Sequence, residues 1–207
     1  MWGWIKTLAI AGSLLASQVG FAASAVGPHE VVVKVVDDLR VAVRKHDDAT
    51  DPEGLALMQE MRGILEPVVD FGFIAKVVMG DTAKTATKDQ LGRFEAVFRE
   101  SLVSTYAKGM KGYVEAEMNI PPLGPEAKGQ NRVAVRQEVT TTSGIQVIDY
   151  TMAKNRSSGE WKLINVVLNG INLGKTFRSQ FAQAIKQHNG DVDKVIQLWA
   201  QAPQAKS

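Results

Sequence analysis

The sequence contains no cysteine, only three histidines, and few aromatic residues, which make up 7% of its 207 residues. The lack of cysteine excludes disulfides, cysteine-based zinc sites and thiol nucleophiles. An excess of charge of one sign is also lacking, since 24 basic residues stand against 22 acidic ones. A balance this close to neutral gives no strong field for nucleic acid. The chain is therefore predicted to be neither a disulfide scaffold nor a nucleic-acid-binding protein.

Long apolar runs are lacking after the first 25 residues. This first segment has one basic residue, Lys6, a mainly apolar stretch over residues 8–15, and a small-residue end, Ala23-Ser24-Ala25. These features are typical of a secretory signal peptide cut after Ala25, with Ala22 as a second cleavage position. The alternative is a membrane anchor, but the apolar stretch is shorter than the roughly 20 residues that a span needs. We expect residues 1–25 to be a signal peptide and residues 26–207 to form one domain.

The apolar periodicity predicts helices, then strands, then helices. Spacings of three and four predict helices over residues 30–45, from Asp51-Pro52 to residue 65, from Pro67 to residue 79, and after the capping box Thr87 to Gln90. Alternation predicts strands over residues 114–120, 133–139, 145–153 and 161–168. Helical spacing returns beyond residue 177, and Asp191 is predicted to cap the final helix. Short turns between successive strands predict an antiparallel meander. The fold class is therefore α+β, a curved antiparallel sheet of about four to five strands with several helices packed on it.

The last of these strands, in Trp161 to Leu168, is apolar at both alternate sets of positions, with Leu163 and Val167 in one set and Ile164, Val166 and Leu168 in the other. A strand of this kind is covered on both faces. The segment after it, Gly170 to Thr176, resembles a phosphate-binding loop because it ends in Gly-Lys-Thr. However, that loop needs four residues between its glycines and a parallel sheet, whereas here three residues separate Gly170 and Gly174 in an antiparallel setting. We therefore predict a turn and no nucleotide site.

Other catalytic sets are weakly represented. The histidines, His29, His46 and His188, are isolated from one another and are interpreted as surface side chains. Asp70 and Asp149 are the only acids in strongly apolar surroundings, and a hydrogen-bonded structural role is predicted for both. No set of residues combines a nucleophile, a base and an oxyanion site. The sequence predicts no enzyme, no metal and no cofactor.

Two stretches carry a resemblance to a known family. One is Glu66 to Phe71, followed by Met79-Gly80 and a helix that includes Arg93-Phe94, Phe98 and Thr105-Tyr106-Ala107. The other includes Trp161-Lys162, Gly170-Ile171 and Arg178-Ser179-Gln180-Phe181. Over about residues 30 to 200 the chain resembles the MlaC family, also called the toluene-tolerance family of periplasmic phospholipid-binding proteins. This chain differs locally from the pattern of the family, at Asp81-Thr82-Ala83 and at Asn165 and Asn169.

The resemblance implies a monomeric phospholipid carrier in the periplasm that maintains outer-membrane lipid asymmetry. Its partners would be an outer-membrane lipoprotein complex and an inner-membrane ABC transporter with a lipid-binding substrate protein. It also implies an NTF2-like or cystatin-like fold with an apolar lipid pocket between sheet and helices, and a diacyl glycerophospholipid as the ligand.

We expect ten side chains to line the tail pocket: Phe73, Val77, Phe98, Leu102, Tyr106, Val135, Val147, Tyr150, Val166 and Leu168. Arg178 is a candidate for orienting the head group or for bracing the start of the last helical region. Two alternatives stay open. One is an NTF2-like enzyme that uses Asp149 with Tyr150 in the same pocket, and the other is an envelope interaction module that carries nothing.

Overall fold

The computed structural model describes residues 26–46, 51, 54–110 and 112–201 of the chain. The expected signal peptide, residues 1–25, lies outside the described residues. The helices are α1 (Pro28–Lys45), α2 (Leu55–Leu65), α3 (Phe71–Met79), α4 (Lys88–Met110), α5 (Leu173–Gln187) and α6 (Val192–Gln201), with short 3-10 helices η1 (Gly80–Lys84) and η2 (Pro125–Ala127). The strands are β1 (Glu117–Asn119), β2 (Arg132–Thr141), β3 (Gly144–Lys154), β4 (Trp161–Leu168) and β5 (Ile171–Asn172).

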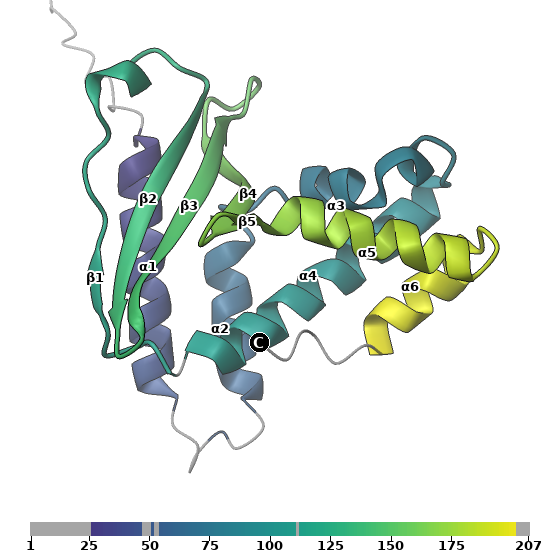
Figure 1. The fold of residues 1–207 in the computed structure, drawn as a ribbon, viewed down its shortest axis with the longest axis horizontal. Coiled ribbons are helices and arrows are strands. Elements are labelled where there is room, and N and C mark those ends of the chain that lie inside the picture. The colour runs from purple at the N-terminus through teal and green to yellow at the C-terminus, as the bar shows by residue number, and fades with distance from the viewer. Residues whose placement is uncertain (1–25, 47–50, 52–53, 111, 202–207) are drawn as a thin grey trace, which may run out of the picture.

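The sheet is an antiparallel meander whose spatial order, β1-β2-β3-β4-β5, follows the chain order. The turn between β2 and β3 contains Gly144 at a φ of 117°, a value that glycine adopts without strain. In Figure 1 the sheet and α1 form one side of the molecule, and α3 to α6 form the other. The prediction of an α+β fold with a curved antiparallel sheet is confirmed.

Helix starts follow the capping residues in the sequence. Thr87 and Gln90 form the predicted capping box of α4, with Gln90 N bonded to Thr87 Oγ1 at 3.1 Å and Thr87 N bonded to Gln90 Oε1 at 3.0 Å. Asp191 accepts a hydrogen bond from Lys194 N at 2.9 Å and starts α6. Both predicted caps are confirmed.

The start of α3 differs from the prediction, which began this helix at Pro67. Val69 instead forms a parallel bridge with Leu163 of β4, and the helix begins at Phe71. Asp70 is the N-cap, and its carboxylate accepts a hydrogen bond from Phe73 N at 2.9 Å. The bridge prevails over helical periodicity because it satisfies backbone groups of residues 68 to 70 on the sheet, and Asp70 has the structural role predicted for it.

Strand β4 also differs in which side chains share a face. A bulge at Ile164 of β4, opposite Thr151 and Met152, shifts the pairing, so that Leu163 lies opposite Met152 while Val166 lies opposite Tyr150. Leu163 and Val166 therefore share one face, although strict alternation assigned them to different faces. The predicted first strand is likewise shorter than expected, because only residues 117–119 of the range 114–120 pair with β2.

The segment after β4 contains Gly174-Lys175-Thr176, and its structure shows whether it forms a phosphate-binding loop. Strand β5 pairs antiparallel with β4, with Val167 opposite Asn172. The Asn172 side chain then accepts a hydrogen bond from Lys175 N at 3.0 Å and caps α5. This geometry lacks the parallel strand that a phosphate-binding loop requires, which confirms the prediction of a turn.

Two separate apolar cores stabilise the two sides of the molecule. On the helical side, α3 to α6 bury an aromatic cluster in which the rings of Phe94 and Phe181 are 4.8 Å apart and those of Phe94 and Trp199 are 5.4 Å apart. On the sheet side, Val32 and Val36 of α1 pack against β2 and β3. A third group joins α1, α2 and the second half of α4.

Candidate functional site

The candidate site is built on the face of the sheet that points toward the helices, which we call the inner face. On β2 every second residue from Val133 to Val139 is buried, and the residues between them are exposed or half-buried. The register places Met152, Tyr150 and Ile148 of β3 beside this buried set. On β4, Val166 and Leu168 continue the same face opposite Tyr150 and Ile148.

Helix α1 packs on part of the inner face. Val32 and Val36 lie in one cluster with Val133, Val135 and Met152, all of which are buried. Farther along β3 and β4, Ile148, Tyr150 and Val166 are only half-buried, and Leu168 is 37% exposed. Apolar side chains that remain partly uncovered on an otherwise packed face are the feature expected of a binding surface.

Helix α4 contributes the side of the site that faces Tyr150. Phe98, Leu102 and Tyr106 lie on one stripe of α4 at a spacing of four residues, and along this stripe burial falls from Phe98, which is 1% exposed, to Tyr106, which is 41% exposed. Leu102 is half-buried and packs against the aromatic cluster. The stripe therefore leads from the sealed helical core to a partly open region.

The two tyrosines lie close together in this region. Burial raises the pKa of Tyr150 above its ordinary value, and the neighbouring Tyr106 phenol raises it further. Burial also raises the pKa of Tyr106, although its side chain is 41% exposed. Tyr106 therefore lies between packed protein and solvent. Both phenols stay neutral at physiological pH and can act as hydrogen-bond donors.

Gln137 fixes the position of Tyr150. Its side chain is 3% exposed and lies among the valines of β2 on the inner face. Tyr150 Oη donates a hydrogen bond to Gln137 Oε1 at 2.5 Å, and Gln137 Nε2 contacts Met118 Sδ at 3.1 Å. Because a buried amide is costly without partners, this chain of contacts holds the Tyr150 ring in one orientation.

We call the partly open region the seam, and it comprises Leu102, Tyr106, Ile148, Tyr150, Val166 and Leu168. Five of the ten predicted tail-pocket residues are among these six. Sequence reasoning missed Ile148 and Gln137, and the signal that could have found them is the period of two. Ile148 is two residues from Tyr150, and Gln137 is the polar member of the alternating set Val133, Val135, Gln137, Val139.

The other predicted tail-pocket residues lie elsewhere. Phe98 and Val135 are fully buried, each in a different packed core. Phe73 and Val77 are 43% and 37% exposed on α3, where Ala75, Val78 and Met79 supply the core instead. Val147 pairs with Glu138, which places it on the outer face of the sheet. Val147 therefore does not share a face with Tyr150.

Arg178 lies on α5 against the end of α3. A side-chain carbon at Gly80 would come within 2.9 Å of Arg178 Nε, so the guanidinium packs directly on the Gly80 backbone. The pKa of the neighbouring Asp81 is lowered, first by its hydrogen bond from Lys84 and further by Arg178. Arg178 therefore joins α5 to the end of α3, and both roles considered for it stay predictions.

Asp149 and Tyr150 do not point into one pocket. They are successive residues of β3, so their side chains point to opposite faces of the sheet. On the outer face Asp149 accepts two hydrogen bonds from Arg136, at 2.9 and 3.2 Å. The acid that the enzyme alternative requires is therefore held in an ion pair away from the seam, in the structural role predicted for it.

Within the described ranges, no group of three His, Asp or Glu side chains is arranged to hold a metal ion. In the same part of the chain, no helix has the length and apolar character needed to cross a membrane. The seam offers a ligand the phenol of Tyr106, because the Tyr150 hydroxyl already donates to Gln137.

Comparisons with known proteins agree with this geometry. The family model described as MlaC protein matches residues 33–201. The toluene tolerance protein ttg2D of Pseudomonas putida is 33% identical over 175 residues, which cover 84% of this chain and 80% of that protein. The intermembrane phospholipid transport system binding protein MlaC of Haemophilus influenzae is 21% identical over 148 residues, which cover 70% of this chain and 69% of that protein.

A solved structure shares the fold. The phospholipid-binding protein from Ralstonia solanacearum, in complex with a phospholipid, superposes with a TM-score of 0.74 at 24% identity. The match covers 85% of this chain and 96% of that chain. The arrangement of a meander sheet beside a helical layer is therefore common to the two proteins.

Proposed function

The chain belongs to the MlaC family, and from this premise we propose that it is a phospholipid carrier whose seam holds the acyl chains. One observation supports the location most: the apolar inner face is buried along β2, where α1 packs on it, and is left partly uncovered on β3 and β4, near Tyr106. Acyl chains are the ligand class that gains most from covering such a surface. The phospholipid named for the Ralstonia solanacearum protein supports the same class of ligand.

The energetics explain why a carrier is needed. Burying one methylene is worth about 0.8 kcal/mol, so two chains of roughly 16 carbons represent on the order of 25 kcal/mol relative to water. A free lipid would therefore almost never cross an aqueous space. A bilayer offers the same burial, so the transfer of lipid from membrane to protein is a small difference between two large terms. A carrier depends on this near-balance, because it must both load and unload.

The cellular setting forms part of the proposal. The sequence pattern of residues 1–25 supports export, and the family supports a place in the periplasm between an outer-membrane lipoprotein complex and an inner-membrane ABC transporter. In this setting direction comes from partner affinities or from ATP hydrolysed by the transporter. The described residues carry no phosphate-binding loop that could couple ATP to transport.

Native mass spectrometry of the gently purified mature protein tests the proposal. We expect one or more bound diacyl glycerophospholipids, which are released on denaturation and identified by extraction. A matched control is the same protein after delipidation and refolding, which should regain phospholipid from vesicles. A protein that carries no phospholipid after either treatment would contradict the carrier function.

A further inference from the structure

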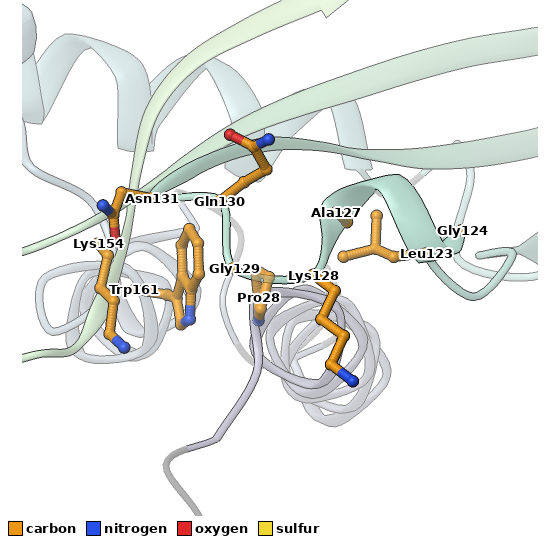
Figure 2. A pocket seen from close by; sticks show the side chains of 10 residues that line it. All are labelled: Pro28, Leu123, Gly124, Ala127, Lys128, Gly129, Gln130, Asn131, Lys154 and Trp161. Carbon is orange, nitrogen blue, oxygen red and sulfur yellow. The ribbon is translucent and has the colours of Figure 1, made fainter.

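A pocket lies at the end of the sheet where β3 ends and β4 begins (Figure 2). Its volume is about 400 Å³, and its walls come from α1, η2, β3 and β4. The ten residues that line it are Pro28, Leu123, Gly124, Ala127, Lys128, Gly129, Gln130, Asn131, Lys154 and Trp161. Figure 2 shows Lys154 beside the Trp161 ring and Lys128 on the opposite wall, with both ammonium groups on the same side of the pocket. We call this site the basic pocket.

The basic pocket has firm walls. Leu123, Ala127 and Trp161 pack against the core between α1 and the sheet, which anchors its apolar floor. The loop that carries Lys128 is closed by backbone hydrogen bonds, including Ala127 N to Gly124 O at 3.1 Å and Lys128 N to Pro125 O at 3.1 Å. On the other side, Lys154 N bonds to Asn131 O at 2.9 Å. The pocket is therefore preformed, which lowers the entropic cost of binding.

Positive charge is concentrated at this end of the molecule, in a chain that is otherwise close to neutral. The turns over residues 121–132 and 153–162 carry five basic side chains and two acidic ones, Glu126 and Glu160. Glu160 is paired with Lys162 at 3.0 Å. Among the described residues, Lys128 and Lys154 form no such pair, and both are exposed. The first turn of α1, which begins at Pro28, carries Glu30, so the positive charge of the pocket comes from Lys128 and Lys154.

The size and lining of the pocket favour a single anionic head group over a protein partner. Its volume is that of a small-molecule site, whereas a stable protein interface needs about 1,200 Å² or more of buried surface. Tryptophan beside lysine is typical of side chains at a membrane surface. The pocket is also separate from the seam, because Trp161 and Leu168 are at opposite ends of β4, about 23 Å apart for an extended strand.

We propose that the basic pocket binds the phosphate of an anionic phospholipid in a bilayer surface, and so docks the protein on a membrane by the end of the sheet remote from the seam. Lys128 and Lys154 contact the phosphate oxygens from two sides. The glycerol lies on the apolar floor of Leu123 and Trp161. Membrane docking and cargo binding then occupy different ends of the sheet. A substitution can therefore change the affinity for the membrane without changing the affinity for the cargo lipid.

The test measures co-sedimentation of the full mature protein with phosphatidylcholine vesicles, with and without phosphatidylglycerol. The pair Lys128→Gln and Lys154→Gln should weaken binding to the phosphatidylglycerol vesicles about 25-fold, since each lysine near an anionic surface contributes about fivefold. The matched control, Lys186→Gln with Lys194→Gln, removes the same charge from exposed positions on α5 and α6. It should change binding less than twofold.

Each outcome of this experiment decides the matter. Loss of vesicle binding in the pocket pair alone, with the amount of co-purified phospholipid unchanged, supports the proposal independently of the seam. An equal loss in the control pair would show that binding follows net charge alone, and would overturn it. The proposal would also be overturned if wild-type protein bound vesicles equally well with and without phosphatidylglycerol. The same holds if it bound inorganic phosphate in the pocket but no vesicle.

Discussion

The helical layer and the seam contain similar side chains but use them differently. In the helical layer Phe94, Phe98 and Phe181 are at most 1% exposed and stack with one another and with Trp199. In the seam Tyr106 is 41% and Leu168 is 37% exposed, although both belong to apolar faces that are elsewhere packed. The difference shows that the aromatic side chains of the helical layer are used up in packing, whereas those of the seam stay partly uncovered. The first region stabilises the fold, and the second is available to a ligand.

The largest expected effect is the loss of stability when a ring is removed from the aromatic cluster of the helical layer. Phe94→Ala should lower the free energy of unfolding by about 3–5 kcal/mol, because it leaves a cavity among fixed rings. Phe73→Ala is the matched control, since Phe73 is 43% exposed on α3, and its cost should be below about 1 kcal/mol. Urea unfolding measures both. Equal losses in the two variants would show that the aromatic cluster is not the structural core.

The next effect concerns the two faces of β3. Ile148→Asn places an amide on the inner face, where burial without partners costs about 1–3 kcal/mol, so retention of phospholipid should fall about ten- to a hundredfold. Val147→Asn changes the adjacent residue on the outer face and should leave retention unchanged. Extraction of lipid from the folded variants, with unfolding midpoints as a check, measures both. Loss in the Val147 variant alone would place the lipid on the outer face.

Alkaline pH should lower the stability that the seam contributes and leave that of the aromatic cluster unchanged, because its phenylalanines and Trp199 do not titrate. The pKa of Tyr150 is raised above the ordinary 10.0 by burial and then by Tyr106. Its contribution to stability is therefore fully present below pH 10 and is lost as the pH rises toward the higher folded value, at about 1.4 kcal/mol per pH unit. Tyr150→Phe should make this slope clearly shallower in urea titrations, and the remainder comes from Tyr106, whose pKa burial also raises. A slope as steep in the variant as in the wild type would contradict the burial of the Tyr150 phenol.

The smallest effect concerns the hydroxyl of Tyr106. This neutral donor lies between an apolar face and water, where the ester carbonyls of a diacyl lipid would lie. Wild-type protein should therefore retain a diacyl phospholipid about fivefold better than its diether analogue, which lacks the carbonyls. Tyr106→Phe should remove that preference, and Tyr113→Phe, at a 47% exposed position, should keep it. Competition followed by native mass spectrometry measures the ratio, and equal preference in all three proteins would remove this role.

The sequence predicted the helical layer better than the sheet. Capping residues and apolar spacing are local signals, so Thr87 with Gln90 and Asp191 marked their helices correctly. Long-range pairing is not a local signal. The bridge from Val69 to Leu163 delayed the start of α3, and the bulge beside Thr151 moved Leu163 to the other face of β4.

For the candidate site the same limit applies. Tyr106, Tyr150 and Val166 could be chosen from composition and periodicity, but which part of the inner face stays uncovered follows only from how the helices pack. The basic pocket joins Pro28 to Lys128, Lys154 and Trp161. These residues are far apart in the chain, and no motif connects them.

Photo-crosslinking with a phospholipid that carries a diazirine in its acyl chain tests the central claim most directly. After loading and irradiation, peptide mapping should find the label on the seam residues Leu102, Tyr150, Val166 and Leu168. The outer-face residues Val147 and Asp149 and the sealed rings of Phe94 and Phe181 should stay unlabelled. Labels concentrated on those residues, or spread evenly over the surface, would contradict the claim that the seam holds the acyl chains.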